Sequence, residues 1–181
     1  MLRRCLDALY LGAGYLAGAF MVAIFVLMMA LSIGREVSLN IPAGDDFASW
    51  CMAAMAFLGL AHTFRHGEMI RVGLLIDHLT GRTRWFVEMF ALIVGCGFIG
   101  FFAYYAVQMN WQSWKFNDMS SGVVAVQLWI PQLGYSSGLV ILLIAFVDEL
   151  VHVALGGDPR YEKPKPKTAE EVVEQAIQSG V

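Results

Sequence analysis

Charged residues are scarce in this chain of 181 residues. Asp, Glu, Lys and Arg make up only 15% of it, against roughly 25% in soluble proteins. Hydrophobic residues account for 58%, and the mean hydropathy is +0.61. The few charges are clustered, which leaves long uncharged runs between them. This pattern excludes an ordinary soluble domain and indicates an integral membrane protein.

Cysteines and catalytic motifs are sparse as well. Cys5, Cys51 and Cys96 form no CxxC pair, so the sequence predicts no disulfide framework and no cysteine-rich metal site. It also lacks the GxSxG, HExxH and Walker-type glycine motifs that mark common catalytic sites. A net charge of −3 provides no basic stripe for nucleic acid. We therefore expect neither an enzyme nor a nucleic-acid partner.

Four apolar runs are long enough to cross a membrane, since about 20 apolar residues span the hydrocarbon core as a helix. The first exceeds the apolar region of a cleavable signal peptide, about 7–15 residues, and is predicted to be retained. We predict an all-α integral membrane domain over residues 1–155, followed by a mobile polar tail over 156–181. The predicted transmembrane helices cover about 9–33, 47–64, 86–109 and 123–147.

Basic residues predict the orientation, because Lys and Arg in short loops favour the cytoplasm. Ten of the twelve basic residues lie before the first span, between the second and third, or after the fourth. Arg35 and Lys115 are the exceptions. Both termini are therefore predicted to be cytoplasmic.

Several segments suit the membrane surface. The run IRVGLLIDHLTGRTRW, residues 70–85, is too short and too charged to span and predicts an interfacial amphipathic helix on the cytoplasmic side. Trp111 and Trp114 suit an aromatic belt at the outer end of the third span. Trp129 and Pro131 mark an alternative start for the fourth span, because proline is tolerated in a first helical turn.

Small and acidic residues predict how the helices pack and begin. Gly14 with Gly18, and Gly134 with Gly138, have the small-xxx-small spacing that lets membrane helices approach closely. These pairs favour a bundle in which several helix faces pack on protein. The acidic pair Asp45-Asp46 suits the start of the second span, where a carboxylate caps the helix and is favoured by its dipole.

His62 and His66 allow two interpretations. Their i, i+4 spacing can bind a metal or, with another helix, haem. A haem carrier, however, needs histidines facing one another from different spans, whereas His78 and His152 lie at the cytoplasmic edge of the predicted domain. The leading interpretation is a turn held at the lipid headgroups, where histidine is a common interfacial residue and basic residues attract anionic lipid.

The order of these features resembles the small membrane (Q) subunit of tripartite ATP-independent periplasmic (TRAP) transporters. The resemblance covers most of residues 1–155. Met69 and Gly73 depart from it, since many family members have a histidine and an acid near these positions. The features that carry it are Arg35, Asn40-x-Pro42, Asp45-Asp46, the segment FLGLAHTFRHGEMIRV and Trp129-x-Pro131.

The resemblance implies a small permease subunit in the bacterial inner membrane. Such a subunit braces a large many-span permease (M) subunit and helps to dock a periplasmic substrate-binding (P) protein, in a sodium-driven transporter for organic acids. Sodium and substrate sites are implied on the large subunit, with no cofactor in this chain. Contacts with partners or lipid are expected for Arg35, Asp45, Asp46, His62, Arg65, His66, Arg71, Trp111, Trp114 and Trp129.

Two other classes of function stay open at this stage. The first is a haem- or quinone-binding membrane anchor of a redox complex. The second is an autonomous small exporter, which would need a titratable group at mid-depth in the membrane. The charged residues instead cluster near the ends of the spans.

Overall fold

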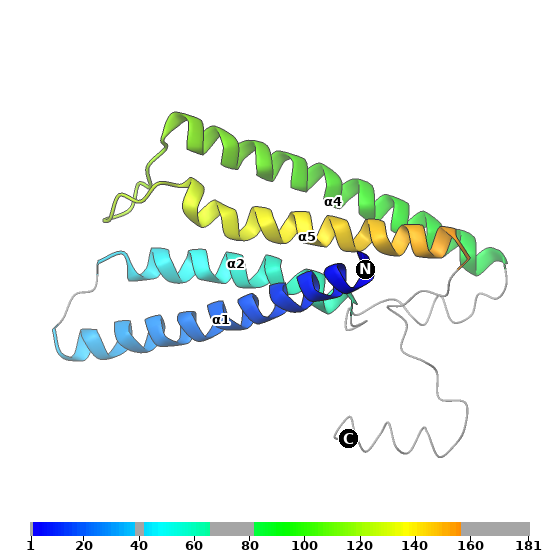
Figure 1. The fold of residues 1–181 in the computed structure, drawn as a ribbon. Coiled ribbons are helices and arrows are strands. Elements are labelled where there is room, and N and C mark those ends of the chain that lie inside the picture. The colour runs from blue at the N-terminus through cyan, green and yellow to red at the C-terminus, as the bar shows by residue number, and fades with distance from the viewer. Residues whose placement is uncertain (1, 39–41, 66–81, 157–181) are drawn as a thin grey trace, which may run out of the picture.

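The computed structural model describes residues 2–38, 42–65 and 82–156. They form four long helices that run alternately in opposite directions (Figure 1). Each helix is long and apolar enough to cross a membrane, which confirms the prediction of an all-α protein with four spans. The helices are α1 (Leu2–Glu36), α2 (Gly44–Arg65), α4 (Arg82–Phe116) and α5 (Trp129–Ala154).

The helices lie in a layer, in the order α1, α2, α5, α4 (Figure 1). Extensive contacts join α1 to α2, α2 to α5 and α5 to α4, whereas α1 and α5 touch only slightly. The described helices therefore form a layer that is open on both faces, in which α2 and α5 each pack on two neighbouring helices. Lipid solvates apolar side chains as well as protein does, so no hydrophobic force closes it. Bulky side chains such as Phe90 and Phe98 remain 69% and 66% exposed.

Glycines set the closest helix contacts. A Cβ added to Gly134 would lie 2.5 Å from the Cβ of Ala54, and one added to Gly138 would lie 2.5 Å from the carbonyl carbon of Phe57. A Cβ on Gly14 would lie 2.8 Å from Nδ1 of His62. The packing prediction is confirmed for these three glycines, whereas Gly18 has no such neighbour within 4 Å.

The fourth span begins later than residue 123. Residues 118–128 instead form a small hairpin, in which Ser120 N donates to Val126 O at 2.8 Å and Leu128 N donates to Asp118 O at 2.9 Å. Helix α5 starts at Trp129, which places Pro131 in its first turn, where the missing N–H leaves no intrahelical bond unmade. The alternative start at Trp129 is therefore confirmed.

The two edge helices are longer than a membrane requires. Helices α1 and α4 have 35 residues each, or about 52 Å at a rise of about 1.5 Å per residue, whereas the hydrocarbon core is about 30 Å thick. They must therefore tilt or project beyond it. Of the predicted interfacial segment, 70–85, residues 70–81 lie outside the described residues, and residues 82–85 form the first turn of α4. The tail from 157 onward also lies outside the described residues.

Candidate interaction surfaces

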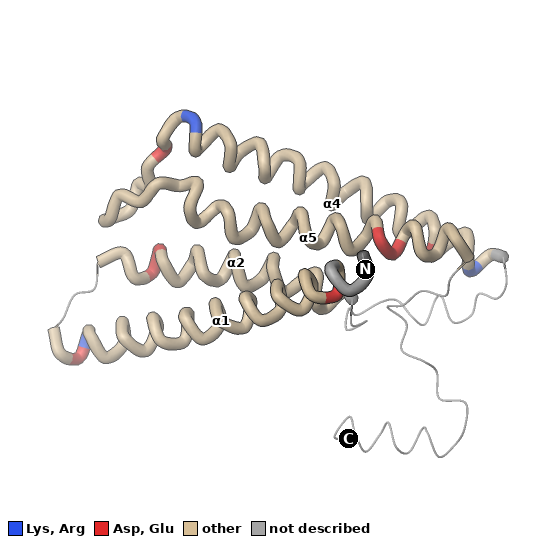
Figure 2. Tube along the Cα trace, in the orientation of Figure 1, with Lys and Arg blue, Asp and Glu red and all other residues tan. Residues whose placement is uncertain are grey.

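Charges gather at the two ends of the layer, with long uncharged stretches between them (Figure 2). We call the end with Glu36, Gly44, Phe116 and Trp129 the tryptophan end. The opposite end, where α1 begins and α5 finishes, is the carboxylate end. Both ends and both faces of the layer are candidate surfaces for interaction.

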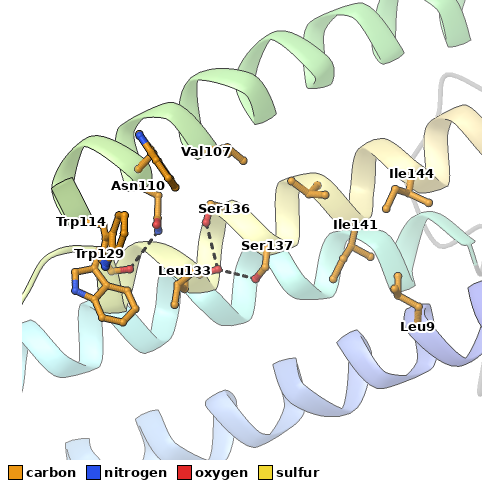
Figure 3. A pocket seen from close by; sticks show the side chains of 12 residues that line it. Leu9, Val107, Asn110, Trp114, Trp129, Leu133, Ser136, Ser137, Ile141 and Ile144 are labelled. Atoms are coloured by element: carbon orange, nitrogen blue, oxygen red, sulfur yellow. Dashed lines mark hydrogen bonds between the residues drawn. The ribbon is translucent and has the colours of Figure 1, made fainter.

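The two predicted belt residues, Trp111 and Trp114, lie at the tryptophan end, where Trp129 begins α5. The rings of Trp111 and Trp114 lie 5.1 Å apart on α4, and both side chains are exposed. Asn110 Nδ2 donates to Trp129 O at 3.1 Å, which joins α4 to the start of α5 (Figure 3). Trp129 Nε1 in turn donates to Gln127 Oε1 at 2.9 Å. The three tryptophans thus form one aromatic rim, fixed by a hydrogen bond between helices.

The predicted charged contacts lie at the same end. Arg35 is exposed in the last turn of α1, and Asp45 and Asp46 are in the first turn of α2, so each charge is favoured by its own helix dipole. The hairpin folds close to Asp46, since a Cβ on Gly122 would overlap the carboxylate of that residue. This end therefore presents charges of both signs beside the aromatic rim.

His62 lies half-buried between α1 and α2, with its ring against Gly14. Arg65 is the last residue of α2, and nothing of its side chain is described. His66 and Arg71 lie outside the described residues. Across residues 2–38, 42–65 and 82–156, no three His, Cys, Asp or Glu side chains gather as a metal site would require.

The carboxylate end has two buried acids whose burial sequence reasoning missed. Glu88 of α4 is 6% exposed and Glu149 of α5 is 2% exposed. Arg84 Nε donates to Glu88 Oε1 at 3.0 Å, and the i, i+4 spacing of this pair was the available signal. Trp85 Nε1 donates to Val153 O at 3.5 Å, which also joins α4 to α5. The ion pair thus lies within α4, and the Trp85 bond crosses to α5.

One face of the layer contains an open groove of about 570 Å³ along α5. We call it the serine groove, because Ser136 and Ser137 line it (Figure 3). The Ser137 hydroxyl donates to Leu133 O at 2.6 Å, and that of Ser136 to the same oxygen at 3.4 Å. These hydroxyls are therefore satisfied within their own helix.

The tyrosine groove, of about 480 Å³, has Tyr135 in its wall. Tyr135 and Ser137 are two residues apart on α5, about 200° around the helix, so the two grooves lie on opposite faces. The rings of Tyr135 and Phe57 lie 6.0 Å apart. The groove is lined by Phe57, Phe98, Ile99, Phe102, Tyr105, Ala106, Met109, Tyr135 and Leu139.

Comparison with known proteins identifies the family of this chain. No curated protein matches the chain. Residues 24–156 match the family model described as Tripartite ATP-independent periplasmic transporters, DctQ component. This family is a transporter component and not an enzyme family, and the match gives no support to a redox anchor. The matched segment covers most of the chain, from the middle of α1 through the end of α5, so the chain belongs to the small permease (Q) subunits of TRAP transporters.

Proposed function

We propose that the chain braces the large permease subunit of a sodium-driven, binding-protein-dependent transporter for organic acids in the bacterial inner membrane. The observation that carries this role is the open layer of helices. A layer with aromatic side chains exposed on both faces offers wide surfaces for a second membrane protein. Its own packing holds it together through the glycine contacts of α2 with α5 and of α1 with α2.

The substrate and sodium sites belong, in this proposal, to the large subunit. Uncharged stretches fill the middle of all four helices, over residues 8–34, 47–64, 89–114 and 129–147. Ion and substrate pathways through membranes commonly use ionisable residues within the spans. The composition of these stretches therefore favours a supporting role.

The tryptophan end faces the periplasm in this proposal and contributes to docking of the substrate-binding protein. Arg35, Asp45 and Asp46 provide charges of both signs there, and complementary charge steers such encounters. The carboxylate end then lies at the cytoplasm, in agreement with the distribution of basic residues.

Reconstitution tests this function. Partners recovered with the tagged chain would be purified, and the ligand retained by the binding protein identified by mass spectrometry. Proteoliposomes with the large subunit alone, or with this chain added, would then be compared for uptake of that ligand under an inward sodium gradient. We expect uptake only when this chain, the binding protein and the gradient are all present. Equal uptake without this chain would contradict the proposal.

A further inference from the structure

The serine groove spans about the depth of one membrane leaflet. On α5 its lining runs from Trp129, in the aromatic rim, to Ile144, which lies about 22 Å farther along the helix axis. Tryptophans of this kind mark the headgroup level of a membrane. One leaflet with its headgroups is about 20–22 Å thick, half of the whole bilayer. The groove therefore opens at the headgroups and ends near the middle of the membrane.

The groove is also narrow. Its volume of about 570 Å³, spread over about 22 Å of helix, corresponds to a mean cross-section of about 26 Å². An α-helix with its side chains is about 10 Å across and needs roughly three times that area. A hydrocarbon chain is only about 5 Å wide, since carbon atoms contact one another at about 4 Å. The groove therefore fits a single extended acyl chain and is too narrow to admit a helix.

The polar side chains of the groove are already hydrogen-bonded (Figure 3). The hydroxyls of Ser136 and Ser137 donate to Leu133 O at 3.4 and 2.6 Å. Asn110 Nδ2 donates to Trp129 O at 3.1 Å. All other side chains of the lining are aliphatic or aromatic. An acyl chain, which offers neither donor nor acceptor, therefore covers this surface without breaking a hydrogen bond.

A cation lies above the open end of the groove. Lys115 is exposed on α4, four residues beyond Trp111, and residues four apart share one side of a helix. Its ammonium lies 5.9 Å from the centre of the Phe116 ring and forms no ion pair with any described carboxylate. The indole N–H groups of Trp111 and Trp114 likewise donate to no described residue. This edge therefore presents a positive charge and two donors to an anionic group.

We propose that the serine groove binds a phospholipid, with one acyl chain along α5 and the phosphate at Lys115. Its charge is complementary to the phosphate, which basic side chains at a membrane surface attract. The tyrosine groove is not assigned this role, because none of the three tryptophans of the rim lines it. The inference is separate from the proposed function, since it requires a membrane around the helices and no particular substrate or partner.

Retention of lipid tests the site. The tagged chain, with any partners that accompany it, would be purified in mild detergent, and its bound phospholipid counted by mass spectrometry. Ser137→Phe places a ring in the groove, whereas Ala19→Phe adds a ring at an exposed position of α1 outside it. We expect phospholipid on the parent chain and on Ala19→Phe, and severalfold less on Ser137→Phe. Equal retention by all three, or none by the parent chain, would overturn the proposal.

A second pair of variants tests the headgroup and does not depend on filling the groove. Lys115→Gln and Arg35→Gln each remove one exposed positive charge at the tryptophan end. The purified chains would be titrated with phosphatidylglycerol in detergent. We expect about fivefold weaker binding with Lys115→Gln and unchanged binding with Arg35→Gln. No change with Lys115→Gln, or equal weakening with both variants, would overturn the assignment of the phosphate.

Crosslinking in membranes identifies what covers the groove. Benzoylphenylalanine would replace Ser137 in cells that contain the whole transporter, and the irradiated chain would be analysed by mass spectrometry. We expect an adduct with the mass of a phospholipid. A crosslink from this position to another protein, or to a second copy of this chain, would overturn the proposal and leave the proposed function standing.

Discussion

Gly138 of α5 lies so close to Phe57 of α2 that any side chain would collide with backbone. A Cβ on Gly138 would be 2.5 Å from the carbonyl carbon and 2.7 Å from the carbonyl oxygen of Phe57. Backbone atoms cannot turn aside as the end of a flexible side chain can. The contact between α2 and α5, at the centre of the layer, thus depends on the absence of a side chain at this position.

Gly138→Ala should therefore push α2 and α5 apart. We expect a loss of about 1–3 kcal/mol, the usual range for overpacking a well-packed site, seen as a lower melting temperature of the purified chain in detergent. Gly97→Ala is the matched control, because a Cβ there would meet nothing within 4 Å. Equal melting temperatures for the two variants would contradict the close approach.

A second substitution that restores stability can test the neighbouring contact, between Gly134 and Ala54. A Cβ on Gly134 would lie 2.5 Å from the Cβ of Ala54 and 3.2 Å from its Cα. Gly134→Ala should lower the melting temperature, and adding Ala54→Gly should restore part of it by removing the closest atom. Such coupling is expected for residues in contact. Additive losses from the two changes would show that these residues do not meet.

The Arg84–Glu88 ion pair at the carboxylate end is expected to stabilise the fold. Arg84→Met leaves the carboxylate of Glu88, which is 6% exposed, without its 3.0 Å partner. We expect a loss of about 1–3 kcal/mol, larger than that from Glu88→Gln, because the neutral amide oxygen can still accept a hydrogen bond from Arg84 and no unpaired buried charge remains. Arg35→Met is the control, because exposed substitutions usually change stability by less than about 0.5 kcal/mol. Thermal unfolding in detergent measures the stability of all three variants. A larger loss of stability from Glu88→Gln than from Arg84→Met would contradict the account.

Orientation can be tested by labelling cysteines in spheroplasts. In a background where Cys5, Cys51 and Cys96 are replaced by serine, Val37→Cys and Leu155→Cys place thiols at opposite ends, on side chains 61% and 82% exposed. A membrane-impermeant maleimide should label position 37 in intact spheroplasts and position 155 only after lysis. The opposite pattern would reverse the proposed topology.

Hydropathy predicted the helices better than their ends. The predicted spans 9–33 and 86–109 lie inside α1 and α4, which extend well beyond them, because a helix continues after its apolar run enters the headgroup region. The fourth span, predicted over 123–147, starts six residues before α5, which begins at the alternative start, Trp129. Residues 123–128 are mostly apolar, and hydropathy does not distinguish such a run from a transmembrane helix when backbone bonds close it into a hairpin.

The candidate surfaces could be predicted only in part. Trp111 and Trp114 lie at the end of α4, as predicted, and Gly134 and Gly138 do mark a close contact. That Trp129 lines the same groove as these two tryptophans was not predicted. The burial of Glu149 was not predicted, because hydropathy reports that a carboxylate ends a span and not which helix covers it. The burial of the Tyr135 hydroxyl, which has no hydrogen-bond partner among the described residues, likewise depends on the order of helices in the layer, which no local pattern specifies.

One measurement tests the central claim most directly, which is that this chain serves as the small subunit of a membrane transport complex. The chain would be tagged, extracted gently from its native membranes, and its partners identified and counted by quantitative mass spectrometry. The account predicts a large permease of many spans in near-equal amount. Recovery of a haem- or flavin-bearing protein, or of the chain alone as a stable homo-oligomer, would contradict it.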